Sequence, residues 1–276
     1  VIGSIKELKE KAVDKKLVDN LPELHRPWID EIKIKCSKCH QVVSRIKEVG
    51  DCWLDAGIVP FSTLKYFSDK PYWNKWFPAE LVIEMRAQVR LWFYSLLFMS
   101  ITLENKAPYK NVFAYEEVRD EKGEPMHKSK GNAVWFDEAV EKMGGDVMRW
   151  IYCEQNPSFN LKFGYKIAKE ASSYLTIIWN LGNYVNLYKK IGNKESNDLA
   201  SKWIISRREA VKELVLNYLN NLNPNKAIDV IKQYLLEDLS RTYIHFVRDE
   251  IDENKEIQAT LYNSFLDGLK LLEPFT

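Results

Sequence analysis

The chain has 276 residues, with 40 Lys and Arg against 39 Asp and Glu, 46% hydrophobic and 13% aromatic residues. This composition is typical of a folded protein of one or two domains, and it argues against a disordered chain or a membrane-spanning protein. The formal net charge of +1 removes the simplest electrostatic argument for nucleic-acid binding, so any RNA contact must be local. Residues 1–19 contain no apolar signal-peptide core, and four cysteines do not suggest a disulfide framework, which indicates a cytoplasmic protein. Because the first residue is Val rather than Met, we expect the chain to be a piece of a longer protein.

In chain order, the first predicted element is a solvated helix within residues 5–24. Its apolar residues recur at helical spacing among many charges, and prolines at 22 and 27 end the pattern. Residues 31–49 then alternate like strands on both sides of Cys36-Ser-Lys-Cys39. This pattern predicts a hairpin whose turn carries two cysteines.

Strands and helices alternate between residues 51 and 146. We expect a short buried strand at 81–84, a long apolar helix at 88–103 and a second strand at 111–115, which together predict parallel α/β layering. From residue 165 to residue 272, apolar residues recur at i, i+3 and i+4, as in a helical bundle. Breaks are predicted at 189–199 and 220–225, with a helix beginning near Pro224. The predicted fold class is therefore α/β followed by all-α.

The segment Met126-His-Lys-Ser-Lys-Gly-Asn132 is suited to an anionic ligand. A glycine-containing loop offers backbone N–H groups, while Lys128 supplies an ammonium and Ser129 a hydroxyl to phosphate oxygens. On composition alone, a polar surface loop explains the segment equally well.

Four segments resemble class I aminoacyl-tRNA synthetases, and within the Ile/Val/Leu branch they are most similar to the isoleucyl type. The loop at 126–132 is similar to the KMSKS-type signature, which holds the triphosphate of ATP. Gly50-Asp-Cys-Trp-Leu-Asp-Ala-Gly57 resembles the D-x-W-F-D-S-G stretch, and Glu84-Met-Arg-Ala-Gln-Val-Arg-Leu-Trp-Phe93 resembles E-G-x-D-Q-x-R-G-W-F. Lys106-Ala-Pro-Tyr109 matches the K-A-P-Y segment, and the order and spacing of all four agree with the family.

The resemblance implies an isoleucine–tRNA ligase that uses ATP with Mg²⁺ to activate isoleucine and then transfers it to tRNA. Lys128 and Ser129 would be the catalytic residues of the loop. The amino-acid pocket would be formed by Trp53, Asp55 and Trp92. The residues that would bind ATP or the adenylate are Glu84, Gln88, Met126, His127, Lys128 and Asn132.

The resemblance also implies three regions. Residues 1–49 would be a connecting and editing-return segment, 50–155 the second half of a Rossmann-type catalytic domain, and 156–276 a truncated stem-contact and anticodon-binding domain. On one predicted helix, Lys202, Arg207 and Arg208 are candidate contacts for tRNA phosphates, although a solvated helix face explains them slightly better.

Several family features are missing or altered. The family's first loop lysine falls on Pro125 and its serine on His127, while the acidic residue and the glycine expected beside Glu84 are replaced by Ala87 and Met85. The four histidines contain no H-x-G-H motif, and the editing domain is missing. We therefore expect a fragment that is inactive without the N-terminal half of the same protein. The alternative is a noncatalytic relative that binds tRNA or a partner protein.

Cys36 and Cys39 have the C-x-x-C spacing of a zinc knuckle, because two thiolates across a tight turn can face one tetrahedral ion. Zinc normally takes four ligands, and His40, Cys52 and Cys153 are the other candidates in the chain. Free thiols in a hairpin remain the alternative to a Zn²⁺ site.

Overall fold

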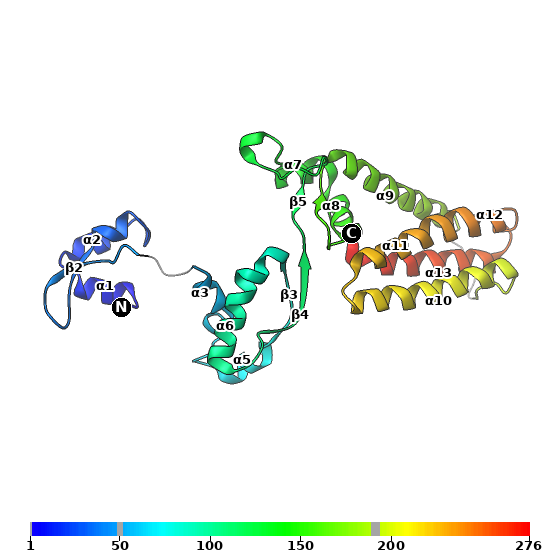
Figure 1. Ribbon diagram of the computed structural model, residues 1–276. Coiled ribbons are helices and arrows are strands. Elements are labelled where there is room, and N and C mark those ends of the chain that lie inside the picture. The colour runs from blue at the N-terminus through cyan, green and yellow to red at the C-terminus, as the bar shows by residue number, and fades with distance from the viewer. Residues whose placement is uncertain (1, 49–51, 189–193) are drawn as a thin grey trace. The chain divides into compact units, whose positions relative to one another are not determined.

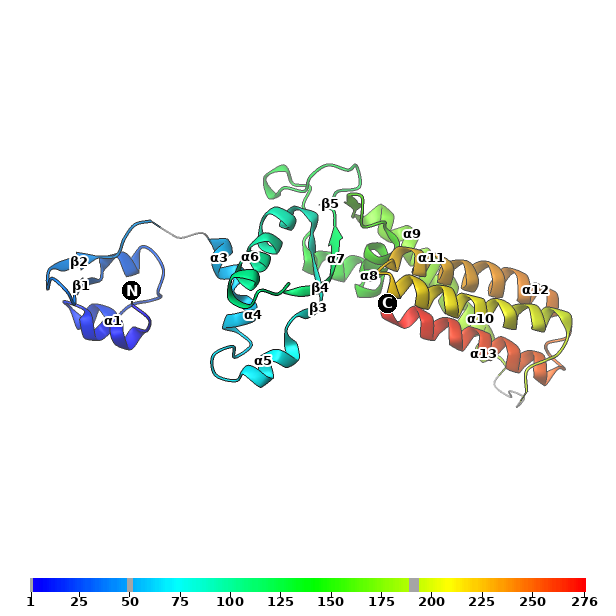
Figure 2. The same cartoon turned by 60° about the horizontal axis from the view of Figure 1, so that its bottom comes forward.

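The computed structural model describes residues 2–48, 52–188 and 194–276, and the chain divides into two units (Figures 1 and 2). One unit contains the residues up to 75 together with 92–106, and the other contains 76–91 together with 107–276. The three regions expected from the sequence, with boundaries at 49 and 155, follow a different division and stay predictions.

The first unit begins with two short helices, α1 (Ile5–Lys11) and α2 (Lys15–Asp19), where the sequence predicted one. The reason is a second N-cap, since the Asp14 side chain accepts a hydrogen bond from the Lys16 N–H and starts a new helix. The predicted hairpin is present: β1 (Lys33–Lys35) pairs antiparallel with β2 (Val42–Ser44). A small apolar cluster joins these elements and consists of Leu8, Ala12, Val18 and Ile32.

The rest of the first unit is helical, with α3 (Cys52–Gly57), α4 (Val59–Ser62), α5 (Lys70–Trp76) and α6 (Trp92–Glu104). Helices α3 and α6 pack closely at Gly57, where an added Cβ would lie 2.7 Å from the Ser95 carbonyl oxygen. The helix expected from residue 88 begins later, at Trp92, because Arg86–Arg90 forms a 3-10 turn after the preceding strand.

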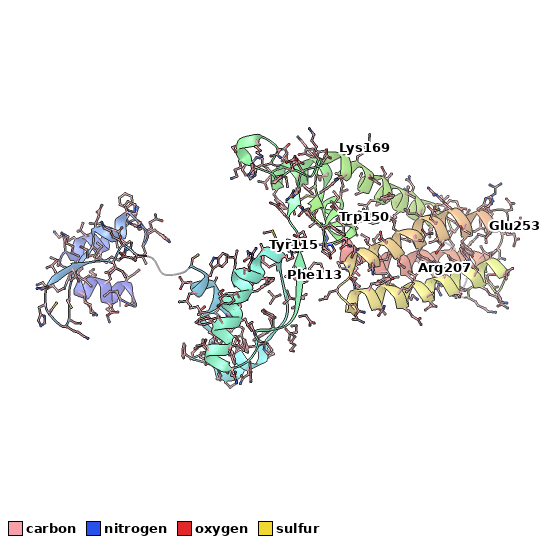
Figure 3. The ribbon with its side chains drawn as sticks, in the orientation of Figure 1. Phe113, Tyr115, Trp150, Lys169, Arg207 and Glu253 are labelled. Carbon is pink, nitrogen blue, oxygen red and sulfur yellow. The ribbon has the colours of Figure 1, made fainter. Side chains whose placement is uncertain are left out.

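The second unit contains the predicted parallel pair, β3 (Ala79–Met85) and β4 (Tyr109–Tyr115). Phe113 and Tyr115 lie on β4 (Figure 3). The prediction of a buried strand at 81–84 is wrong, since Leu81 is 38% exposed and Ile83 54% exposed. Within the described ranges β3 pairs with β4 alone, so no further strand covers these side chains at the edge of the sheet. A second parallel pair joins β5 (Val118–Arg119) to β6 (Leu161–Lys162).

Helices make up most of the second unit, as the sequence predicted. Figures 1 and 2 both show the long helices of its C-terminal part side by side. The chain is helical without interruption from Pro224 to Val247, and the predicted helix start at Pro224 is confirmed. The predicted break at 189–199 lies partly outside the described residues. The helices are α7 (Phe136–Met143), α8 (Gly145–Glu154), α9 (Tyr165–Asn186), α10 (Leu199–Asn220), α11 (Pro224–Gln233), a π-helical stretch (Tyr234–Tyr243), α12 (Ile244–Val247) and α13 (Lys255–Leu272).

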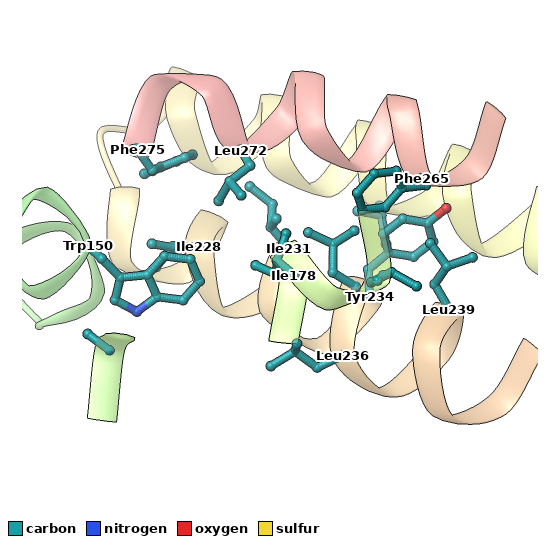
Figure 4. Packing of buried hydrophobic residues seen from close by; sticks show 14 of the residues in the cluster. Trp150, Ile178, Ile228, Ile231, Tyr234, Leu236, Leu239, Phe265, Leu272 and Phe275 are labelled. Carbon is teal, nitrogen blue, oxygen red and sulfur yellow. The ribbon is translucent and has the colours of Figure 1, made fainter. Parts of the chain in front are cut away.

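The main hydrophobic core lies between these helices (Figure 4). Trp150 of α8, Ile231 of α11 and Tyr234 are fully buried, and Phe265 and Leu272 of α13 complete the packing. Burial of such side chains stabilises a helical bundle by about 1.5–3 kcal/mol each. Among the described helices, none is long and apolar enough to cross a membrane.

Candidate functional site

Asp120 and Asn132 close the loop that carries the predicted phosphate ligands. The Asn132 side chain accepts a hydrogen bond from the His127 N–H at 2.9 Å and donates to Asp120 Oδ2 at 2.9 Å and to the Pro125 carbonyl at 3.1 Å. Asp120 also accepts the Glu124 N–H at 2.8 Å. The Asn132 amide and this backbone N–H lower the pKa of Asp120, so the carboxylate is ionised at neutral pH. The loop is therefore ordered by its own side chains.

The tip of the loop presents its polar groups to solvent. Residues Lys128–Lys130 form a 3-10 turn that ends at Gly131, whose φ of 68° lies in the left-handed region that glycine adopts readily. The Lys128 ammonium lies 4.6 Å from the centre of the Trp135 ring. An ammonium, a hydroxyl and backbone N–H groups are together suited to binding phosphate oxygens. The predicted loop residues are half-buried at Met126 and Asn132 and exposed at His127, Lys128 and Ser129.

A cavity of about 790 Å³ lies where β3 and β4 end. Ligands of open α/β sheets bind at such carboxyl ends. The cavity wall includes Arg86, Arg90, Arg119, Glu116 and Glu117. Arg86 Nε lies 2.5 Å from a Glu116 carboxylate oxygen, and Arg119 Nη2 lies 3.1 Å from Glu117. The wall of the cavity therefore contains two of the protein's own ion pairs.

The two residues that were predicted to bind the adenylate, Glu84 and Gln88, are sequence neighbours of residues in the cavity wall. Glu84 is half-buried on β3, opposite Ala114, and Gln88 lies in the turn that follows. Burial and the negative charge of Glu84 raise the pKa of Tyr115. The described cavity wall contains Met85 and Ala87 rather than Glu84 or Gln88, so their roles in binding stay predictions.

The predicted amino-acid pocket residues lie on two helices that contact each other. Trp53 and Asp55 are on α3, and Trp92 is the first residue of α6. The Trp92 indole N–H donates to the Ala56 carbonyl at 3.0 Å, which fixes the ring against α3. Trp53 and Trp92 are half-buried and Asp55 is exposed. The structure thus brings these three residues into one helix pair of the first unit.

The turn that carries Cys36 and Cys39 is closed by backbone hydrogen bonds. The Cys36 N–H donates to the Gln41 carbonyl, and the His40 N–H donates to the Cys36 carbonyl, both at 2.9 Å. Hydrogen bonds from the backbone N–H groups of Cys39 and Lys38 lower the pKa of the Cys36 thiol. In the part of the chain that the structure describes, no group of three or more possible ligands surrounds a point in space. The pair alone is two ligands short of a tetrahedral zinc site.

The predicted tRNA cations on α10 have three different environments. Lys202 is exposed, whereas Arg207 is half-buried and donates two hydrogen bonds to Asp238 at 3.0 and 2.7 Å (Figure 3). The Arg208 side chain is only 10% exposed and pairs with Glu195 at 2.6 Å and with Asp267 at 3.4 Å. This arrangement argues against Arg208 as a phosphate ligand, because its charge is already neutralised inside the bundle.

Three parts of the site were missed at the level of sequence. The Arg86–Glu116 pair joins residues thirty positions apart, and the stacking of Lys128 on Trp135 depends on how the loop folds back. The role of Asp120 was recognisable, because an Asp at the start of the Asp-Glu-Lys-Gly turn commonly accepts backbone N–H groups.

Comparisons with known proteins agree with this architecture. A family model described as tRNA synthetases class I (I, L, M and V) matches residues 2–163, and one described as the anticodon-binding domain of tRNA ligase matches residues 201–276. Isoleucine–tRNA ligases of Clostridium acetobutylicum and Methanothermobacter marburgensis are 33% and 34% identical over 99% of this chain. The chain spans only 28% and 27% of their respective lengths.

The fold also matches a solved structure. A LeuRS in ternary complex with tRNA and LeuAMS, from Agrobacterium radiobacter, superposes with a TM-score of 0.72 at 19% identity, covering 90% of this chain and 33% of that one. At this identity the match supports the fold alone, and it confirms the predicted order of an α/β region followed by a helical domain. Because the first family model covers more than half of the chain, the protein belongs to the class I tRNA synthetases of the I, L, M and V group and carries their anticodon-binding domain.

Proposed function

We propose that this chain supplies the phosphate-binding loop and the anticodon-binding bundle of an isoleucine–tRNA ligase. The observation that carries the proposal is the similarity to two isoleucine–tRNA ligases over 99% of the chain. The reaction would be activation of isoleucine by ATP with Mg²⁺, followed by transfer of isoleucine to the terminal ribose of its tRNA. Adenylate formation is largely a matter of positioning and of neutralising phosphate charge.

In this proposal the exposed groups of the loop meet the phosphates of ATP. Lys128 donates hydrogen bonds to phosphate oxygens and neutralises charge, and the Ser129 hydroxyl adds a donor. Glu84 and Gln88 hold the adenylate, while Trp53 and Trp92 give an apolar wall to the amino-acid pocket. A wall of this kind discriminates by about 1–3 kcal/mol per methylene, which separates isoleucine from valine only modestly.

We expect these 276 residues alone to be inactive, because the sequence contains no H-x-G-H motif. The test is isoleucine-dependent exchange between ATP and pyrophosphate by the purified chain. We expect no exchange above a reaction without isoleucine. Robust exchange would refute the dependence on the missing half of the catalytic fold.

The chain should bind tRNA through its helical bundle. We expect the chain to bind tRNA(Ile) more tightly than tRNA(Leu), with an affinity that falls as salt rises because phosphate contacts release counterions. Lys202→Ala should reduce the salt slope, whereas Glu213→Ala on the same helix should not. Equal affinity for both tRNAs would refute the specificity for isoleucine, and no binding at all would refute the anticodon-binding role.

A noncatalytic tRNA-binding relative is the second candidate function. It is favoured by the Arg86–Glu116 pair inside the cavity and by Ala87 and Pro125, which replace polar residues of the family pattern. The two candidates differ in ligand binding. A nonhydrolysable isoleucyl-adenylate analogue should bind the ligase and not the relative, whereas both should bind tRNA.

In this proposal the chain supplies only part of a zinc site. Cys36 and Cys39 would supply two thiolates, and two further ligands would have to come from elsewhere in the ligase. Structural zinc of this kind would hold the hairpin rigid. Metal analysis of the chain purified without chelator, beside a Cys36→Ser variant, tests the site; zinc content near zero in both would remove it for this chain.

A further inference from the structure

The Lys128 side chain stacks on an aromatic ring. Its ammonium lies 4.6 Å from the ring centre of Trp135, within the distance at which a cation is attracted to the face of an indole. Trp135 is the N-cap residue of α7 and is 55% exposed, so the ring stands at the surface beside the loop. The contact therefore forms where a soluble anion can reach the ammonium.

The fold of the loop brings these two residues together. Gly131 takes a left-handed conformation and its N–H donates to the Lys128 carbonyl at 3.2 Å, which turns the chain back toward α7. Asn132 then anchors the next position through its bonds to His127 and Asp120. The stacking is thus a consequence of an ordered turn.

Lys130 lies two residues after Lys128 and differs from it in having no aromatic partner among the described residues. Both lysines are exposed, and neither forms a side-chain ion pair within the described residues. Lys128 has the aromatic partner, while the structure gives Lys130 no ring contact in the described part of the chain. A free lysine loses most of its rotamer freedom when it binds, and a lysine already held on a ring loses less.

We propose that Trp135 is a positioning residue that holds Lys128 ready for a polyphosphate ligand. The ammonium stacks on the indole, and because Lys128 is exposed, phosphate oxygens can accept hydrogen bonds from it. The ring then lowers the entropy cost of binding and stays in place when the ligand binds. This inference rests on the proposed role of Lys128 as a phosphate ligand.

The test measures binding of inorganic tripolyphosphate to the whole chain by calorimetry at low salt. Trp135→Leu should weaken binding about two- to fivefold, the range expected for an exposed cation–π contact. Trp135→Phe keeps an aromatic face and should weaken binding less. Far-UV circular dichroism checks that each variant keeps its helices. Binding by Trp135→Leu as tight as that of the unmodified chain would overturn the inference.

A double-mutant cycle separates positioning from a structural role. If Trp135 acts through Lys128, Trp135→Leu should have no further effect once Lys128 is replaced by Met, whereas it should keep its full effect beside Lys130→Met. Equal effects in both backgrounds would overturn the inference, because the ring would then act on the loop as a whole.

A ligand-free measurement distinguishes this inference from the proposed function. The indole ring current should shift the Lys128 ε-methylene protons upfield in NMR spectra, and Trp135→Leu should abolish the shift. A missing shift overturns the inference even if tripolyphosphate binds. A clear shift without any tripolyphosphate binding overturns both the proposed phosphate role and the positioning role that depends on it.

Discussion

Replacing Arg208 by Met should destabilise the helical bundle more than replacing any of the more exposed charged residues of α10. The Arg208 side chain is 10% exposed and lies within ion-pair distance of Glu195, Glu209 and Asp267, at 2.6, 3.1 and 3.4 Å. Met preserves much of the volume but leaves three carboxylates close together without their shared cation. Removing one partner of a buried ion pair costs about 3–5 kcal/mol.

The lower end of that range applies here. Lys212 still pairs with Asp267 at 2.7 Å and with Glu209 at 2.9 Å, so Glu195 loses the most. We therefore expect a loss of about 3 kcal/mol, or roughly 6–12 °C in the unfolding midpoint of a domain of this size. The assay is thermal and urea unfolding followed by circular dichroism at the helix band.

Arg207→Met is the matched control, since Arg207 is the next residue and its side chain is 37% exposed with a single carboxylate partner. The Asp238 side chain is 13% exposed, but the Arg207 cation reaches solvent and is screened there, so we expect a loss of about 1 kcal/mol, near the upper limit for such pairs. If Arg208→Met unfolds within about 1 kcal/mol of Arg207→Met, the argument from burial is refuted.

The charged residues around Arg208 also make the stability loss of Arg208→Met depend on pH. Burial raises the pKa of Asp267, but hydrogen bonds from Lys212 and Lys270 and the charge of Arg208 outweigh it, so the pKa is lowered in the folded state. A lowered carboxyl pKa stabilises the fold above the unfolded pKa of about 4, and this stability is lost as pH falls through the folded value. Because Arg208 makes the smallest of these contributions, the deficit of Arg208→Met should shrink modestly below about pH 4. A deficit that stays constant from pH 7 to pH 3 would contradict an electrostatic origin.

Three further predictions concern the remaining parts of the chain. Gly57→Ala should lower the free energy of unfolding by about 1–3 kcal/mol in urea, because the new Cβ would meet a backbone carbonyl of α6. Gly145 has open space around it, so Gly145→Ala should change the free energy of unfolding by less than about 1 kcal/mol. Equal effects of the two substitutions would contradict the close packing at Gly57. Iodoacetamide should modify Cys36 faster than Cys153 at neutral pH after metal removal. Backbone N–H groups lower the pKa of the Cys36 thiol, whereas burial raises the pKa of the Cys153 thiol. The reverse order of modification in mass spectrometry would contradict these two pKa shifts. Asn132→Ala should speed proteolysis within residues 120–132 while leaving the bundle's unfolding midpoint unchanged, and an unaltered cleavage rate would contradict its anchoring role.

The helical half was predictable because its pattern is local. Apolar residues at i, i+3 and i+4 from residue 165 onward identify faces that must be buried, and Pro224 marks a helix start by its fixed φ. The parallel pairing of β3 and β4 followed from the alternation of strands and helices.

The ion pairs of Arg208 and the exposure of residues 81–84 could not be predicted, because they depend on residues far apart in the sequence. Helix periodicity could not show that Arg208 faces three carboxylates, because Glu195 and Asp267 lie on other segments. The burial of a strand also depends on what covers it, so an apolar run at 81–84 is not sufficient to predict a buried strand.

The loop and the cavity place different demands on an incoming ligand. The loop is ordered by Asp120 and Asn132 and leaves the Lys128 ammonium accessible, so a polyphosphate meets donors that are already in place. In the cavity, Glu116 is only 18% exposed and already pairs with Arg86, so a ligand at the carboxyl ends of β3 and β4 must either leave that pair intact or open it. Opening it would leave a poorly hydrated carboxylate without a partner, which is unfavourable unless the ligand itself supplies donors, as ribose hydroxyls do. A ligand at this edge of the sheet therefore has to supply hydrogen-bond donors to Glu116 if it displaces Arg86.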